Sequence, residues 1–267
     1  MIDQNARFEG SIPGVYERCM VPVFFVPYAR NLAASLDLGE GAQILELACG
    51  TGVLTRTLLS SARRPFSLTA TDLNDAMLEL AKQQVPDGDI RWQHVDAASL
   101  PFEPASFDAV ICQFGVMFFR DKVRAASETR RVLRPGGVYL FNTWGALSEN
   151  PCFRVANETI SRFMPEPPTF FALAFGYHDR QQVMADLRAG GFREITIETV
   201  DLEGRSPSVK DLATGLVQAN PGIAAIRERA TSSVAEVTAA VAEALTREFG
   251  SDEVRFPLRA HVATARP

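Results

Sequence analysis

The stretch that decides the fold is ILELACGTG, residues 44–52, in which an apolar run leads directly into a turn of small residues. A helical pattern starts near Val53, so the stretch predicts a buried strand, a tight loop and a helix. Gly50 and Gly52 lack the Cβ atoms that would keep a ligand away from the loop backbone. Because the N–H groups at a helix start favour a carboxylate or phosphate, and ligands of open α/β sheets bind at the carboxyl ends of strands, this loop predicts a binding site.

Strand and helix patterns alternate on both sides of this loop. The β-type runs are residues 43–47, 67–71, 90–95, 109–112 and 138–141. Apolar residues recur at helical spacing in residues 73–84 and 122–133, and Arg134-Pro135-Gly136-Gly137 ends the second of these segments. This alternation predicts βαβ units, and we therefore expect an α/β fold with a doubly wound, mostly parallel sheet.

Helical segments are expected on both flanks of this core. Residues 16–36 have a helical pattern that Pro22 and Pro27 interrupt, which predicts a broken N-terminal cap. Beyond the core, the pattern predicts a helix at 180–189, strands at 194–200 and 254–265, and a helical insertion at 208–249 between the strands. We expect a single domain over residues 1–267, in which 1–39 form the cap, 40–145 the cofactor-binding core, and 146–267 a substrate-side lid, the last strands and the insertion.

The composition is that of a globular protein, with 46% hydrophobic and 22% charged residues. The net charge is −5 and no basic stripe follows the chain, so no nucleic-acid partner is expected. The four cysteines are too widely spaced for a metal pattern or a compact disulfide framework. We expect a cytoplasmic protein without a metal, and the polar start MIDQNARFEG predicts neither a signal peptide nor a membrane segment.

A carboxylate at the end of the second strand is the next indication of function. Asp72 lies 20 residues after Gly52, where it can accept both hydroxyls of a ribose. Dinucleotide-binding folds place an acid at this distance too, but Thr55 stands where their third glycine would be. Glu46 would repel a pyrophosphate and suits a ligand with an ammonium group, and Asp96 follows the third strand. An N-cap role of Asp72 in the helix beginning at Leu73 is an alternative, and both roles can hold together.

Together these segments resemble the class I S-adenosylmethionine-dependent methyltransferases of the small-molecule type, similar to the ubiquinone/menaquinone-biosynthesis methyltransferases. The resemblance is carried by residues 40–145, although Ala48 stands where the family has its first glycine. It implies a Rossmann-like sheet with an antiparallel last strand. It also implies S-adenosylmethionine as the cofactor, with S-adenosylhomocysteine as the product.

The resemblance also implies which residues meet the cofactor. Glu46 would face the amino group of its methionine end, and Asp72 would bind the ribose hydroxyls. Leu73 and Met77 would flank the adenine, and Asp96 would meet the adenine amino group. The full set of expected cofactor-binding residues is Glu46, Ala48, Cys49, Gly50, Gly52, Asp72, Leu73, Met77, Asp96, Ala97 and Gln113. For Cys49 and Met77, packing in the core is an alternative explanation.

Such a protein would transfer a methyl group to an oxygen, nitrogen or carbon of a small, largely apolar metabolite, and the phenylalanine-rich residues 153–175 suggest an aromatic one. Since the donor is already activated, alignment and exclusion of water can supply much of the catalysis without a base. His178 is the candidate catalytic residue, and Tyr16, Trp144 and Tyr177 are candidates for substrate contacts. The same aromatic run could instead form the contact of a homodimer.

Two other classes of function stay open. A nicotinamide-dependent oxidoreductase would explain the glycines and Asp72, but it leaves Glu46 and Asp96 unexplained. A non-catalytic nucleoside-binding partner protein would keep the pocket without turnover.

Overall fold

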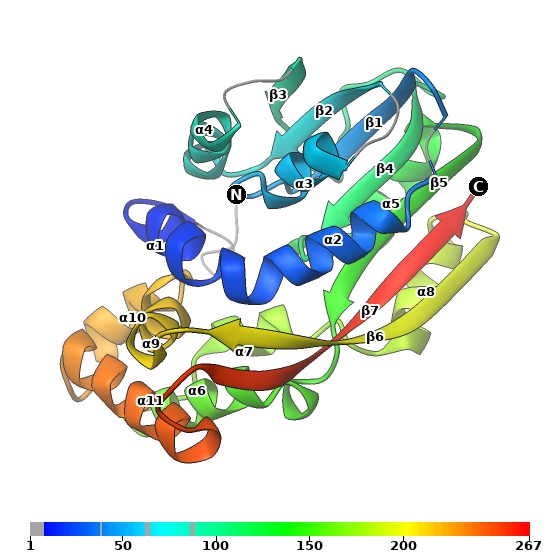
Figure 1. Cartoon of the computed structure of the whole chain (residues 1–267). Coiled ribbons are helices and arrows are strands. Elements are labelled where there is room, and N and C mark those ends of the chain that lie inside the picture. The colour runs from blue at the N-terminus through cyan, green and yellow to red at the C-terminus, as the bar shows by residue number, and fades with distance from the viewer. Residues whose placement is uncertain (1–7, 38, 62–64, 86–88) are drawn as a thin grey trace.

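A seven-stranded sheet with the order β3-β2-β1-β4-β5-β7-β6 forms the centre of the protein (Figure 1). The computed structural model describes residues 8–37, 39–61, 65–85 and 89–267. The strands are β1 (Ala42–Leu47), β2 (Phe66–Asp72), β3 (Ile90–His94), β4 (Phe107–Gln113), β5 (Leu133–Trp144), β6 (Glu194–Ser206) and β7 (Val254–Arg266).

Strands β1 to β5 pair in parallel, and β7 runs antiparallel between β5 and β6. The expected mostly parallel sheet with an antiparallel last strand is therefore confirmed. The chain leaves β1 in one direction to β2 and β3, and returns on the other side of β1 as β4. This reversal places a crevice between the carboxyl ends of β1 and β4, where open α/β sheets bind ligands.

Helices surround the sheet and extend from it at one end. They are α1 (Ile12–Cys19), α2 (Val26–Ala34), α3 (Val53–Ser61), α4 (Asp75–Gln84), α5 (Lys122–Val132), α6 (Pro151–Ser161), α7 (Thr169–Ala174), α8 (Arg180–Ala189), α9 (Val209–Gln218), α10 (Ile223–Arg229) and α11 (Val234–Phe249). The described residues also form three short segments: the π-helix η2 (Val21–Phe25) and the 3₁₀ helices η3 (Val116–Phe118) and η4 (Leu147–Glu149). Within the described ranges, no helix is both long and apolar enough to cross a membrane.

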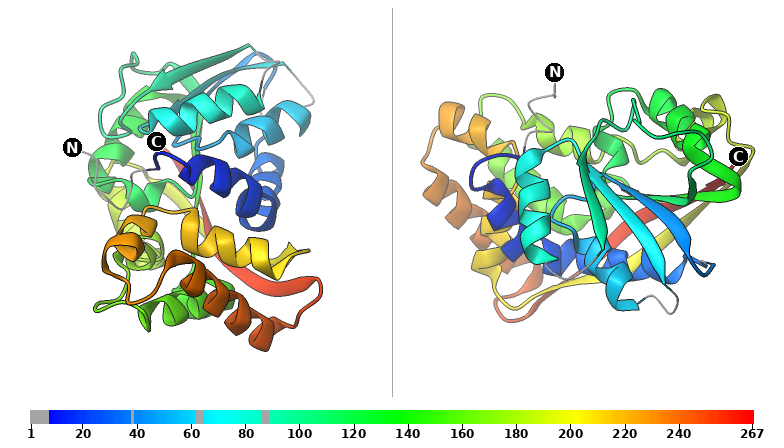
Figure 2. Two further views of the ribbon diagram at one scale, coloured as in Figure 1. Left: turned by 90° about the vertical axis from the view of Figure 1, so that its left-hand side faces the viewer. Right: turned by 90° about the horizontal axis from the view of Figure 1, so that it is seen from above.

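The N-terminal cap is broken as predicted, and η2 forms the break between α1 and α2. Pro22 lies inside η2 and Pro27 in the first turn of α2. A proline cannot donate the backbone hydrogen bond of a regular helix, which explains why the helical path changes here. Figure 2 shows that α1 lies between the core helix α4 and the helix α9 of the C-terminal insertion, both of which it contacts.

The C-terminal elements follow the predicted pattern, with longer strands. The helix at 180–189 is observed at these bounds, and the insertion consists of α9, α10 and α11 with its break at Asn220-Pro221-Gly222. Strand β6 continues to Ser206 because it pairs residue by residue with β7, from Glu194 opposite Arg266 to Ser206 opposite Val254. This two-stranded extension carries the chain from the sheet to the insertion (Figure 1).

Candidate functional site

A cavity of about 320 Å³ lies at the carboxyl ends of the parallel strands. One group of its lining residues, here called the strand-end wall, comprises Ala48, Gly50, Asp72, Leu73, Asn74, Met77, Asp96, Ala97 and Gln113. A second group, here called the aromatic wall, comprises Phe8, Tyr16, Phe25, Phe114, Phe118, Phe119, Trp144, Phe153, Phe170 and Phe175. One cavity therefore joins a polar surface to a large apolar one, which is typical of small-molecule sites.

The loop after β1 adopts a backbone that favours glycine. Gly50 and Gly52 have φ angles of 56° and 81°, and Ala48 has a φ of 51° although it carries a Cβ atom. The N–H of Cys49 donates to the carbonyl of Thr71 at 2.9 Å. Residues 48–52, here called the glycine loop, are thereby hydrogen-bonded to the end of β2, which connects the two cofactor-type motifs.

Asp72 is the buried acid of the strand-end wall, with 6% of its surface exposed. Its Oδ2 accepts from the N–H of Gly50 at 2.8 Å, and its Oδ1 accepts from the N–H of Asn74 at 2.8 Å. Burial raises the pKa of Asp72, while these hydrogen bonds act in the opposite direction. The carboxylate keeps acceptor capacity for a ligand, since its two oxygens offer about four lone-pair sites. The N-cap of α4 is Asn74, so the N-cap alternative for Asp72 is wrong.

Glu46 does not line the cavity in this structure. Its side chain is 1% exposed, and its Oε2 accepts from the Thr55 hydroxyl at 2.6 Å. Burial raises the pKa of Glu46 to about 8, because the hydrogen bonds from the hydroxyl and backbone of Thr55 do not replace the hydration of a carboxylate. Cys49 and Gly52 are likewise absent from the lining, so the structure brings together the other eight of the eleven expected cofactor-binding residues.

Gln113 connects the end of β4 to the N-terminal cap. Its Nε2 donates to the carbonyl of Phe25 at 2.7 Å, and its Oε1 is buried with no hydrogen-bond partner among the described residues. Asp96, at the end of β3, is exposed and accepts from the N–H of Ala98 at 2.9 Å. Both residues line the cavity, as expected for residues at the carboxyl ends of strands in one parallel sheet.

The aromatic wall is built by segments far apart in the sequence. The rings of Phe114 and Trp144 stack with centroids 3.8 Å apart. The ring of Phe8 meets those of Tyr16 and Phe118 edge to face, each at 6.1 Å. Sequence reasoning missed Phe8 and Phe118, because no local pattern indicates that these rings converge on one cavity.

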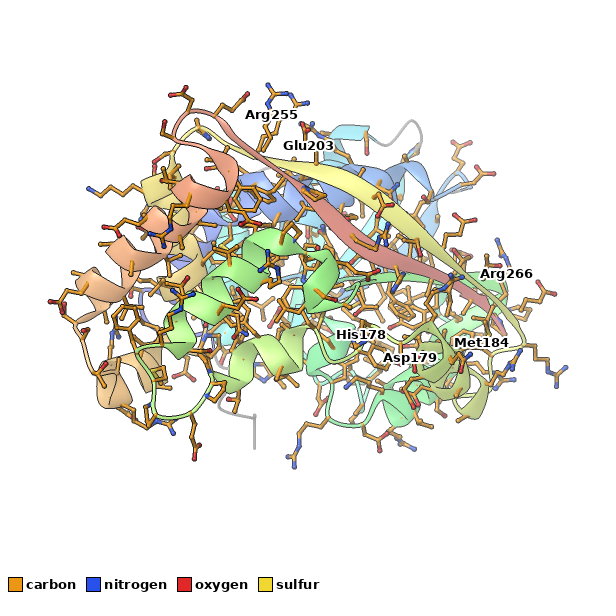
Figure 3. The ribbon with its side chains drawn as sticks, turned by 90° about the horizontal axis from the view of Figure 1, so that it is seen from below. His178, Asp179, Met184, Glu203, Arg255 and Arg266 are labelled. Carbon is orange, nitrogen blue, oxygen red and sulfur yellow. The ribbon has the colours of Figure 1, made fainter. Side chains whose placement is uncertain are left out.

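Two of the three candidate substrate contacts, Tyr16 and Trp144, line the cavity, and Tyr177 does not. The Tyr177 hydroxyl donates to Asp186 at 2.9 Å, so its polar end is engaged with α8. His178 is also outside the lining, and its Nδ1 lies 2.8 Å from the carbonyl of Phe175. Figure 3 shows His178 beside Asp179 at the start of α8. The structure therefore does not bring this histidine to the cavity as a base.

Residues 45–141 match the family model for a methyltransferase domain. The core of this chain is a methyltransferase domain. The resemblance to class I S-adenosylmethionine-dependent methyltransferases is thereby confirmed for the part that contains the whole strand-end wall.

Named relatives align with less than half of the chain. A demethylmenaquinone methyltransferase of Staphylococcus epidermidis is 32% identical over 112 residues, which cover 42% of this chain and 46% of that protein. The ubiquinone/menaquinone biosynthesis C-methyltransferase UbiE of Bordetella avium is 38% identical over 106 residues, covering 39% of this chain and 41% of that protein. The aligned part thus spans less than half the length of these relatives.

The fold as a whole has a solved counterpart. Phosphoethanolamine N-methyltransferase 2 of Haemonchus contortus, in complex with phosphomonomethylethanolamine and S-adenosylhomocysteine, superposes with a TM-score of 0.60. The superposition covers 96% of this chain and 56% of that one, at 16% sequence identity. At this identity the likeness shows that the methyltransferase domain and its flanks share a fold with that enzyme.

Proposed function

We propose that the protein transfers a methyl group from S-adenosylmethionine to an oxygen, nitrogen or carbon atom of a small, largely apolar metabolite, leaving S-adenosylhomocysteine. The observation that carries this proposal is the meeting of the glycine loop and Asp72 with an aromatic wall in one cavity. A nucleoside and an apolar acceptor need these two surfaces side by side. The names of the quinone-biosynthesis relatives, and the cofactor named with the Haemonchus enzyme, support the same reaction.

In this proposal the strand-end wall holds the cofactor. Asp72 accepts hydrogen bonds from the ribose hydroxyls, and Leu73 and Met77 flank the adenine. Asp96 and the backbone at Ala97 meet the edge of the base. The glycine loop, with Gly50 in the lining, receives the methionine end, because the missing Cβ atom lets a ligand approach the backbone there.

The aromatic wall would hold the acceptor and protect the reaction from water. When bound, S-adenosylmethionine would supply an activated methyl group. The acceptor atom would bond to the methyl carbon as the carbon–sulfur bond breaks, the electron pair would stay on the sulfur, and any proton on the acceptor atom would be lost to solvent. Aromatic faces also attract the positive charge of a sulfonium, so Tyr16 and Trp144 would serve both partners of the reaction. No side-chain base is required for this step when the acceptor is sufficiently nucleophilic.

Among the described residues, no observation favours an oxidoreductase. The pattern of dinucleotide-binding folds needs a third glycine where this chain has Thr55, and here the Thr55 hydroxyl is bound to the buried Glu46. The proposed function treats the whole chain as one domain, because the cap and the insertion both supply residues to the cavity.

Calorimetric titration with S-adenosylhomocysteine, S-adenosylmethionine, NADH and NADPH tests this proposal. We expect micromolar dissociation constants for the two sulfur nucleosides and no heat from the nicotinamide cofactors. Incubation with S-adenosylmethionine and a panel of hydroxylated and aminated naphthalenes should then yield S-adenosylhomocysteine together with a methylated product. Binding of a nicotinamide cofactor alone would overturn the proposal.

A further inference from the structure

The glycine loop needs restraints that its own sequence does not supply. Its backbone is in the left-handed region at Ala48, Gly50 and Gly52. Glycine loses more conformational freedom on folding than any other residue, so ordering this loop is costly. Hydrogen bonds from Cys49 and Gly50 to the end of β2 hold the first part of the loop. The second part, around Thr51, is held from another direction.

Arg56, in α3, connects this second part to the N-terminal helix α1. Its Nη1 donates to the carbonyl of Thr51 at 2.8 Å, and its Nη2 donates to Glu17 Oε1 at 2.8 Å. The two side chains of this ion pair are 27% and 19% exposed, so the pair is less screened by water than a typical surface pair. The other carboxylate oxygen of Glu17 is buried with no partner among the described residues, which makes Arg56 the anchor of this side chain.

The N-terminal segment also reaches the loop after β2. The N–H of Phe8 donates to Asn74 Oδ1 at 3.1 Å, while the N–H of Asn74 donates to Asp72 at 2.8 Å. The ring of Phe8 is part of the aromatic wall. Residues 8–19, here called the brace, therefore contact both loops of the strand-end wall, and two residues of the brace, Phe8 and Tyr16, belong to the aromatic wall.

We propose that the brace is a structural part of the cofactor site, and that Glu17 and Arg56 are positioning residues which hold the glycine loop in its binding conformation. Neither residue lines the cavity, so their effect passes through the carbonyl of Thr51. This inference rests on the proposed function, because it takes the cavity to be the cofactor site. It extends that function by assigning cofactor affinity to a segment outside the methyltransferase domain at 45–141.

The test compares Glu17→Gln, Arg56→Met and Arg56→Lys with the unmodified protein. S-adenosylhomocysteine is the probe, since its ammonium and carboxylate charges cancel and a change in protein charge alone affects it little. We expect roughly tenfold weaker binding in Glu17→Gln and Arg56→Met, the effect of one lost charge-assisted hydrogen bond on an equilibrium. Arg56→Lys should recover part of the affinity, because an ammonium can still donate to Thr51 or Glu17.

A matched control comes from the ion pair of Arg154 with Glu248, at 3.1 Å, in which neither residue lines the cavity. Glu248→Gln removes a comparable carboxylate, and we expect it to leave the affinity for S-adenosylhomocysteine within twofold. Hydrogen exchange of the peptide that contains residues 48–55 is the second measurement, made without any ligand. Exchange should accelerate in Glu17→Gln and Arg56→Met and stay unchanged in Glu248→Gln.

The two measurements separate this inference from the proposed function. If the unmodified protein does not bind S-adenosylhomocysteine, the proposed function fails, and the exchange data still show whether the brace restrains the loop. Unchanged exchange in the brace variants overturns the inference whatever the affinities are. Faster exchange with affinity unchanged from the unmodified protein also overturns it, because the restraint would then have no bearing on the cofactor.

Discussion

Replacing Asp72 with alanine should separate the cofactor role of this residue from its structural one. The carboxylate is buried and accepts hydrogen bonds from the N–H groups of Gly50 and Asn74, both at 2.8 Å. Alanine removes these acceptors and leaves the N–H of Gly50 without its partner. The same change removes the acceptor that the ribose hydroxyls would use.

The loss of stability and the loss of cofactor affinity can both be estimated from the structure. Loss of a hydrogen bond to a charged group costs about 1.5–3 kcal/mol, and the removal of a buried carboxylate, whose pKa burial raises, offsets part of this loss. We therefore expect a decrease of about 1–2 kcal/mol in the free energy of unfolding, or a few degrees in Tm. For the cofactor, the same range of about 1.5–3 kcal/mol means that S-adenosylhomocysteine should bind roughly 10- to 150-fold more weakly.

Asp108 offers a matched control at the opposite end of the sheet. Its Oδ2 accepts from the N–H of Gln43 at 2.8 Å and from Arg134 at 2.7 Å, and it does not line the cavity. Thermal unfolding and calorimetry of Asp72→Ala and Asp108→Ala should show a loss of stability in both and a loss of affinity in Asp72→Ala alone. Equal affinities for S-adenosylhomocysteine in Asp72→Ala and the unmodified protein would refute the assignment of Asp72.

Three further changes test other parts of the site. Burial raises the pKa of Glu46 from 4.5 to about 8. Between these pH values the native state holds a proton on Glu46 that the unfolded state has lost. The free energy of unfolding should therefore fall by up to about 1.4 kcal/mol per pH unit as the pH rises through this range. Glu46→Gln should flatten this slope in urea unfolding across the neutral range, and an unchanged slope would contradict the burial argument. A Cβ atom at Gly115 would lie 2.4 Å from the Cβ of Ala48 and 2.8 Å from the Sγ of Cys112, so Gly115→Ala should cost about 1–3 kcal/mol. Adding Ala48→Gly should recover part of this loss in urea unfolding. If it recovers none, the contact with the Cβ atom of Ala48 is not the cause of the loss. Trp144→Leu should slow methyl transfer to aromatic acceptors while the dissociation constant of S-adenosylhomocysteine stays within twofold, and a parallel loss of both would assign Trp144 to the cofactor.

The strand-end wall could be predicted from the sequence because its residues are fixed by local pattern. A parallel sheet brings the carboxyl ends of its strands to one edge, so Asp72, Asp96 and Gln113 meet there once the strands are identified. The direction of a side chain was harder to predict. Glu46 lies one residue before the end of β1, and its carboxylate turns to Thr55 of α3 instead of the cavity.

The contacts of the lid could not be predicted from proximity in the sequence. Phe175 lines the cavity, yet Tyr177 two residues later binds Asp186 of α8, and His178 turns back to the carbonyl of Phe175. The chain changes direction within one or two residues in a turn between two helices. No periodic pattern of apolar residues continues through such a turn, so the sequence does not indicate which side chains face the cavity. Phe8 was missed for a related reason, since its partners Phe118 and Phe170 are distant in the chain.

The division of the cavity has a consequence for the search for the acceptor. Every residue of the strand-end wall falls within residues 45–141, the part that matches the methyltransferase domain. Most of the aromatic wall comes from outside it, with Tyr16 and Phe25 from the cap, Trp144 from the end of β5, and Phe170 from α7. Shared sequence therefore supports a shared cofactor far more than a shared acceptor. Acceptors are better chosen by their fit to flat, apolar rings than by the names of the relatives.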